Sequence, residues 1–204
     1  MTERSKARIG FFLYLLTLLV FNTQNTFMIL NMFLAFAALE IAYLLPLFNV
    51  KSKIEIVGSL LMYSTFILLA PNTLYVLTDL IHLNRYVFNF RKELALVEWW
   101  NFTVLVAGVL LAVYYHTLIV KQVELLVAKL KYRQLYVVIF MLLCSLGIYI
   151  GRFLRFHSIH IFTEPMNLIE TLFGSMNLDS IMFMIFIFVL QLIIYALFMP
   201  KKGR

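Results

Sequence analysis

The stretch LAPNTLYVLTDLIHLNRY, residues 69–86, decides how this chain folds. It ends a long apolar run, and a straight helix over residues 54–83 would be about 45 Å long, well beyond a hydrocarbon core of about 30 Å. Pro71 removes a helical hydrogen bond and clashes with the preceding turn. The sequence therefore predicts a helix that ends near Pro71, with the side chain of Asn72 satisfying carbonyls that the proline frees. Residues 73–83 would then bend into the outer interface or re-enter the membrane.

The composition supports a membrane protein. The chain has 204 residues, of which 63% are hydrophobic and 13% charged, and its mean hydropathy is +0.94. Soluble domains are roughly half apolar and a quarter charged. The single cysteine, Cys144, excludes a disulfide framework and a cysteine metal cluster.

About six apolar segments are long enough to predict membrane-spanning helices. The predicted fold is therefore all-α, a polytopic membrane helix bundle in which residues 1–204 form one transmembrane domain. We expect the first segment to be a retained anchor, because Asn22-Thr23-Gln24-Asn25 offers no signal-peptide cleavage site. The predicted spans are 9–25, 27–48, 54–71, 97–120, 134–154 and 179–199.

Lysine and arginine residues predict the orientation of the bundle. With the N-terminus in the cytoplasm, most of the 17 basic residues fall on the cytoplasmic side. The positive-inside rule then places both termini of this multi-pass protein in the cytoplasm. The same basic loops account for the net charge of +7, so the expected partners are membrane lipids and not nucleic acid. Protein partners are not predicted. The basic residues left outside are Arg85, Arg91, Lys92, Arg152 and Arg155.

Polar residues gather at the predicted outer ends of two spans. On a helix Asp79 and His82 share a face, and Asn72 falls on nearly the same face. Arg152 and Arg155, three apart in GIYIGRFLRFHSIHIFTEP (147–165), would also share a face. Two like charges need an anion nearby, and charges this close to hydrocarbon indicate a functional site.

Asp79 is one acid that could compensate an arginine, and Glu98 at the outer start of the next span is another. The planar guanidinium group of arginine can donate two parallel hydrogen bonds to phosphate oxygens. Arg152 and Arg155 therefore predict a site for an anionic or lipid-linked ligand. Trp99, beside Glu98, belongs to the aromatic belt and would support such a site. The alternative is that the arginines reach lipid phosphates and Asp79 only holds helices together.

Two further sites are weaker hypotheses. Asp79, His82, His157 and His160 could together bind zinc or another divalent metal. Glu40 and His116 lie at similar inner depths of two spans, where they could form a pair that relays protons, although Glu40 could equally be a neutral acid bonded between helices.

Two motifs resemble a known family. PNTLYVLTDLIHL (71–83) is similar to the pattern PNxPYLxTDLxHL, and GIYIGRFLRFHS (147–158) to GIYLGRFLRxNSWD. Both belong to a bacterial integral-membrane family, DUF1361, catalogued as a domain of unknown function. The resemblance implies a bacterial cell membrane location and no established activity. His157, Ile159 and His160 depart from the second pattern, which puts a strict catalytic role for position 157 in doubt.

These residues are compatible with three classes of function. A membrane-embedded enzyme or binding protein would use Arg152 and Arg155 as an anion clamp, with Asp79 or His82 as general base. A small transporter or transporter subunit would need Glu40 and His116 to join the same path. An accessory protein would use the polar residues only for packing. No hydrolase triad, phosphate-binding loop or H-E-x-x-H helix is present, so the sequence does not decide whether the protein is an enzyme.

Overall fold

The computed structural model describes residues 1–21, 23–48, 55–86, 88, 94–156 and 163–199. All the regular secondary structure within these residues is helical. Two 3₁₀ segments extend α2 and α4, and a π-helical segment, η3, extends α6. The elements are α1 (Glu3–Val20), α2 (Met28–Leu44), η1 (Leu45–Leu47), α3 (Glu55–Leu69), α4 (Asn72–Thr78), η2 (Asp79–Arg85), α5 (Leu96–Leu126), α6 (Arg133–Tyr149), η3 (Ile150–Leu154), α8 (Pro165–Ser175) and α9 (Leu178–Phe198).

Within this described part, five helical segments are long and apolar enough to cross a membrane. They confirm a polytopic, all-helical membrane protein. The predicted span 9–25 is not among them, because α1 ends at Val20 and its first two turns carry Glu3, Arg4, Lys6 and Arg8. The five segments are Met28–Leu47, Glu55–Arg85, Leu96–Leu126, Arg133–Leu154 and Leu178–Phe198.

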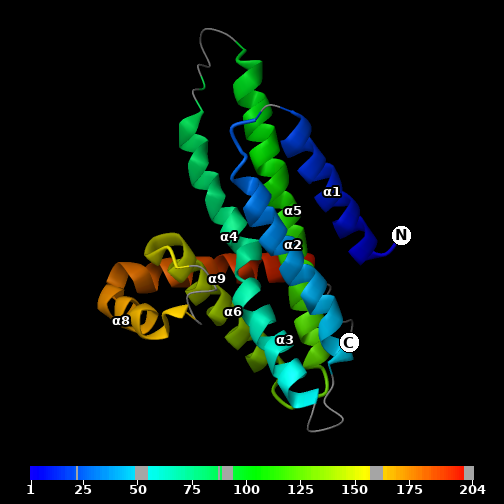
Figure 1. Ribbon diagram of the computed structural model, residues 1–204, viewed down its shortest axis with the longest axis vertical. Coiled ribbons are helices and arrows are strands. Elements are labelled where there is room, and N and C mark those ends of the chain that lie inside the picture. The colour runs from blue at the N-terminus through cyan, green and yellow to red at the C-terminus, as the bar shows by residue number, and fades with distance from the viewer. Residues whose placement is uncertain (22, 49–54, 87, 89–93, 157–162, 200–204) are drawn as a thin grey trace.

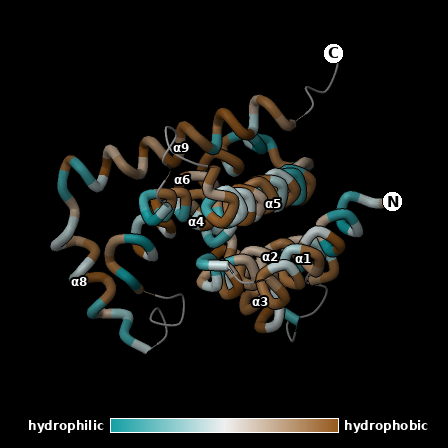
Figure 2. The backbone as a smooth tube through the Cα atoms, turned by 90° about the horizontal axis from the view of Figure 1, so that it is seen from above, coloured by the Kyte–Doolittle hydropathy of each residue, from teal (hydrophilic) through white to brown (hydrophobic). Residues whose placement is uncertain are grey.

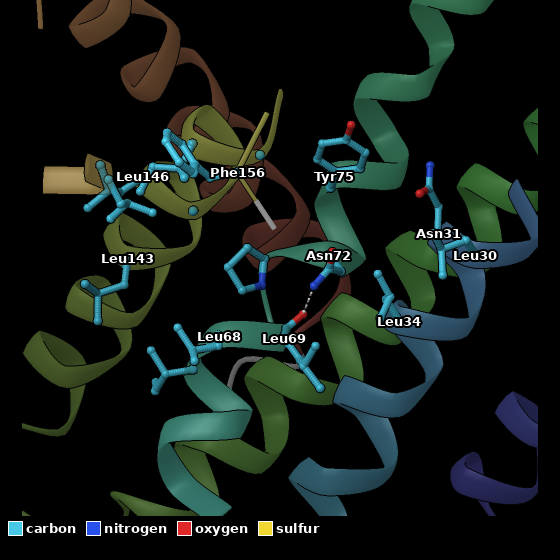
Figure 3. Close-up of a pocket in the computed structure, with 16 residues that line it drawn as sticks. Leu30, Asn31, Leu34, Leu68, Leu69, Asn72, Tyr75, Leu143, Leu146 and Phe156 are labelled. Carbon is cyan, nitrogen blue, oxygen red and sulfur yellow. Dashed lines mark hydrogen bonds between the residues drawn. The ribbon is translucent and has the colours of Figure 1, made fainter. Parts of the chain in front are cut away.

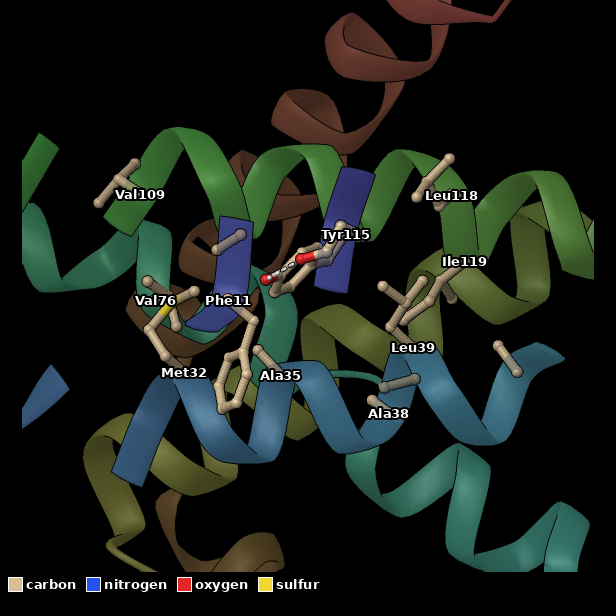
Figure 4. Packing of buried hydrophobic residues seen from close by; sticks show 14 of the residues in the cluster. Phe11, Met32, Ala35, Ala38, Leu39, Val76, Val109, Tyr115, Leu118 and Ile119 are labelled. Carbon is tan, nitrogen blue, oxygen red and sulfur yellow. Dashed lines mark hydrogen bonds between the residues drawn. The ribbon is translucent and has the colours of Figure 1, made fainter. Parts of the chain in front are cut away.

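The long helix α5 lies at the centre of the bundle (Figure 1). Helix α2 packs along it through a face of small residues, of which Ala35, Ala38 and Ala42 are fully buried. Small side chains let helices approach closely, which is how helices associate in membranes. Tyr115 and Ile119 of α5 fill the space opposite this face (Figure 4). Helix α9 crosses the other helices at a steep angle in both views (Figures 1 and 2).

The N-terminal half of α1 is attached to α2 by ion pairs. The Arg4 and Arg8 guanidinium groups both donate to the Glu40 carboxylate, each with an N–O distance of 2.6 Å. His116 instead contacts the Thr73 hydroxyl, at 3.2 Å from Nδ1. The proton-relay pair of Glu40 and His116, one of the two alternatives for Glu40, is therefore wrong, since the docking of α1 supplies Glu40 with two cations.

The predicted break at Pro71 is confirmed. Helix α3 ends at Leu69 and α4 begins at Asn72. The Thr73 N–H donates to the Ala70 carbonyl, at 3.2 Å, so it no longer reaches the carbonyl of Leu69 as in a regular α-helix. The Asn72 side-chain amide donates to that Leu69 carbonyl at 2.9 Å, which is the role predicted for it.

The chain beyond the break stays helical. Residues 72–85 pack against α2 and α5, and Leu74, Val76 and Asp79 are buried. The segment thus has an apolar face that the bundle covers, and its position in the membrane, interfacial or re-entrant, stays a prediction. Its end is anchored by Tyr86, whose hydroxyl donates to Asn25 at 2.5 Å. Burial raises the pKa of Tyr86 above its usual value, which keeps this hydroxyl protonated.

Candidate functional site

Asp79 is the centre of a polar cluster that joins three elements. Its side chain is 1% exposed. One carboxylate oxygen accepts a bond from Arg152 Nη2 of η3, and the other accepts one from Asn31 Nδ2 of α2, both at 2.7 Å. A buried carboxylate is retained only when it is paired and hydrogen-bonded. We call Asn31, Tyr75, Thr78, Asp79 and Arg152 the Asp79 cluster.

Arg152 is held on two sides. Its Nε and Nη2 atoms donate to the Thr78 hydroxyl at 2.9 and 2.6 Å, and its guanidinium lies 4.4 Å from the ring centre of Tyr75. The residue belongs to the π-helical segment η3, a geometry that is frequent at functional sites. An arginine carries five N–H donors. The two on Nη1 have no partner in the part of the chain that the structure describes, and the side chain is 14% exposed.

His82 lies beside Asp79 without joining the ion pair. Its Nδ1 is 2.9 Å from the backbone carbonyl of Asp79 and 3.8 Å from the carboxylate. Because a carbonyl only accepts, Nδ1 carries a hydrogen in this contact. The ring lies tilted against that of Phe27, with 4.4 Å between the ring centres, and its side chain is 18% exposed.

Arg155 is separated from Arg152. The π-helix ends at Leu154, and Arg155 adopts a left-handed conformation with φ of 58°. The two residues therefore do not share one helical face, and the structure does not bring the two guanidinium groups onto the same partner. Arg155 is exposed and makes no ion pair or hydrogen bond with the described residues.

The other predicted residues lie apart from this cluster. Glu98 is in the first turn of α5, where its Oε2 is buried without a hydrogen-bond partner among the described residues. Trp99 packs edge-on against Phe88 and Phe102, at ring distances of 5.2 and 5.5 Å. His157 and His160 lie outside the described residues. Among the residues that are described, no three His, Cys, Asp or Glu side chains form a group that could hold a metal ion.

A pocket of about 450 Å³ adjoins the Asp79 cluster. It lies between α2 and α6, at the break between α3 and α4 (Figure 3). Asn31 and Tyr75 line it and also belong to the cluster, and Asn72 is the third hydrogen-bonding side chain in its wall. The rest of the lining is apolar or glycine: Leu30, Leu34, Ile67, Leu68, Leu69, Pro71, Leu143, Leu146, Gly147, Ile150, Gly151, Phe156 and Leu168.

Three members of the Asp79 cluster were not predicted from the sequence. Asn31 is a polar residue inside an apolar span, a signal that could have identified it. Tyr75 and Thr78 belong to the motif at the break, but a tyrosine and a threonine there carry no charge that singles them out. Asp79 and His82, the predicted catalytic candidates, do not line the pocket.

Comparison with known proteins gives one match. The family model described as a protein of unknown function, DUF1361, matches residues 30–194. The match runs from α2 into α9 and includes the whole Asp79 cluster and the pocket. No curated protein and no solved structure matches the chain.

Proposed function

The chain belongs to the DUF1361 family of proteins of unknown function, and we propose that it binds an anionic, lipid-type ligand in the pocket beside the Asp79 cluster. The observation that carries this proposal is the composition of the pocket wall. Ligand pockets of about 300–1,000 Å³ are mostly apolar and have a few placed polar groups. The pocket has this character, since only Asn31, Asn72 and Tyr75 interrupt its apolar lining.

The apolar part of the ligand would lie against the leucines of α2, α3 and α6. Six leucines and two isoleucines line the pocket from these helices and η3, with one more leucine from α8. They offer no hydrogen bond, so a hydrocarbon chain would gain from burial there while a polar group would lose its hydration. The wall thus favours a molecule with a long apolar segment.

The anionic part would be bound by arginine. Asp79 compensates Arg152, whereas no described residue pairs with the positive charge of Arg155. The Nη1 group of Arg152 adds two N–H donors that no described residue accepts, and such donors suit phosphate or carboxylate oxygens. Neither arginine is among the lining residues, but Arg152 contacts Tyr75 and Arg155 immediately precedes Phe156, and both of these neighbours line the pocket.

Binding is better supported than catalysis. Both carboxylate oxygens of Asp79 are engaged with Arg152 and Asn31, which leaves this acid poorly placed to take a proton from a ligand. The transporter alternative loses its suggested relay, because Glu40 is paired with Arg4 and Arg8. A purely structural role would explain the ion pair between Asp79 and Arg152. It would not explain the pocket or the exposed charge of Arg155.

The location of the site is part of this proposal. We place the chain in the bacterial cytoplasmic membrane as one transmembrane domain. In this placement α1 makes a sixth crossing beside the five long apolar segments, both termini lie in the cytoplasm, and the pocket faces the outer leaflet. The distribution of basic residues supports this orientation. In intact cells a membrane-impermeant thiol reagent should label an Arg85→Cys variant and leave a Thr2→Cys variant unlabelled. The reverse labelling would invert the orientation.

The binding proposal is tested by filling the pocket. Leu146 lines the pocket, whereas Leu142, one turn earlier on α6, does not line it and is exposed. We expect Leu146→Trp to weaken binding of oleoyl lysophosphatidate at least about tenfold, since about 1.4 kcal/mol of lost contact gives that factor. Leu142→Trp should bind like the unmodified protein.

Native mass spectrometry of the full chain in detergent micelles would give these affinities. Monoolein, which has the same chain without the phosphate, should bind the unmodified protein more weakly. Equal affinity of both variants and the unmodified protein for oleoyl lysophosphatidate would reject the pocket as the binding site. Equal affinity for the two ligands would reject the anionic part of the proposal.

A further inference from the structure

Two asparagine side chains in the pocket wall have amide groups whose orientation is fixed by their hydrogen-bond partners. We infer that the ligand carries a hydroxyl group next to its apolar chain, and that the side-chain amides of Asn31 and Asn72 recognise this hydroxyl. The inference rests on the proposed function and specifies its ligand further. It depends on the orientation of two amides, each of which is set by a partner that can only accept hydrogen bonds.

The orientation of the Asn72 amide is set by a backbone carbonyl. Its partner is the Leu69 carbonyl oxygen, 2.9 Å from the nitrogen Nδ2. A carbonyl cannot donate, so the reversed amide would place two oxygens against each other. The oxygen Oδ1 of Asn72 is therefore turned away from this bond, and it has no hydrogen-bond partner among the described residues.

The orientation of the Asn31 amide is set by the carboxylate of Asp79. The distance from Nδ2 to the carboxylate oxygen is 2.7 Å. The other oxygen of this carboxylate accepts a hydrogen bond from Arg152, and a carboxylate offers acceptors only. Asn31 must therefore present its nitrogen to Asp79, which leaves Oδ1 without a partner in the described part of the chain. Figure 3 shows Asn31, Asn72 and Tyr75 among the residues of the pocket wall.

These groups favour a hydroxyl over other polar groups. Each amide has an oxygen acceptor and one remaining N–H donor that no described residue engages, and the Tyr75 hydroxyl can both donate and accept. A ligand hydroxyl also donates and accepts, so it can donate to the amide oxygen and accept from the remaining amide N–H. An ether or ester oxygen only accepts, and it would leave the amide oxygens unpaired inside an apolar wall.

The anionic group and the hydroxyl have different partners. Phosphate or carboxylate oxygens only accept when ionised, and they match the N–H groups of Arg152 and Arg155. The hydroxyl matches the amide oxygens of Asn31 and Asn72. The chemical class that combines both with one apolar chain is a hydroxylated amphiphile with an anionic head, such as a glycerol phosphate that carries one acyl chain.

The test compares two ligands that differ in one methyl group. We would measure binding of oleoyl lysophosphatidate and of its O-methyl ether, in which the free glycerol hydroxyl is methylated, to the full chain in detergent micelles. The ether should bind about tenfold more weakly, because it cannot donate to the amide oxygens. Equal binding of the two ligands overturns the inference and leaves the proposed function standing. Failure of both to bind rejects the proposed function itself.

Variants assign the effect to the pocket. Asn72→Ala should reduce the preference for the hydroxylated ligand severalfold, whereas Asn84→Ala should retain it. Asn84 is exposed, lies in the same helical segment and does not line the pocket. An unchanged preference in Asn72→Ala overturns the role of Asn72. Because the ligand pair is also compared on the unmodified chain, the inference stays testable if this variant fails to fold.

Discussion

Replacement of Asp79 by alanine is expected to lower the free energy of unfolding by about 3–5 kcal/mol, the usual effect of removing one partner from a buried ion pair. Arg152 would keep its charge in a site where its side chain is 14% exposed, and Asn31 would lose its acceptor. The destabilisation arises from these unpaired groups more than from the lost attraction. Unfolding by sodium dodecyl sulfate in mixed micelles, followed by circular dichroism, measures it.

A double variant separates the two contributions. Asp79→Leu combined with Arg152→Met removes both charges, so it should be less destabilising than Asp79→Leu alone. Arg85→Met is the control, because Arg85 is exposed and lies over the Phe27 ring, at 5.6 Å from its centre. The expected effect of this control is below about 1 kcal/mol. If Asp79→Ala were no more destabilising than Arg85→Met, Asp79 would not be the centre of the cluster.

The pairing of Asp79 with an arginine could be predicted from the sequence because it depends on charge and depth alone. A carboxylate and two arginines at the same end of apolar helices must form an ion pair with each other or with another counter-ion. The break at Pro71 was predictable for a similar reason, since a proline acts on its own turn of helix. The capping of Leu69 by Asn72 follows from the same local geometry.

The separation of Arg152 from Arg155 could not be predicted in this way. A spacing of three implies one face only while the α-helix continues, and here a π-helical segment and a left-handed residue follow Tyr149. The partner of Glu40 was missed because it depends on how α1 docks. Its two arginines are 36 and 32 residues away in the sequence, and neither spacing nor depth connects them.

The pocket could not be predicted from the sequence either. A cavity is the space that packed helices leave between them, so it depends on their crossing angles and on side-chain volumes from several elements. The residues of its wall read as ordinary lipid-facing or core positions. Only Asn31 and Asn72 break that pattern, because each is a polar residue in an apolar stretch, and nothing in the sequence places the two in one wall.

Gly147 controls how closely α6 approaches the break at Pro71, and Gly147→Ala should lower the free energy of unfolding by about 1–3 kcal/mol through overpacking. A Cβ atom at this position would lie 2.5 Å from Cγ and 2.9 Å from Cβ of Pro71. The proline ring is rigid, so relief requires α6 to move outward. Because both residues line the pocket, we expect the variant to bind oleoyl lysophosphatidate more weakly as well.

The matched control is Gly58→Ala in α3, where an added Cβ meets nothing within 4 Å. Alanine has the higher helix propensity, so this substitution should stabilise the protein by about 0.5–1 kcal/mol. The two variants make the same chemical change in neighbouring helices and are expected to shift stability in opposite directions. Detergent unfolding of both, beside the unmodified chain, measures the difference. If Gly147→Ala were as stable as Gly58→Ala, α6 would not be held against Pro71, and the wall of the pocket would have to be formed differently.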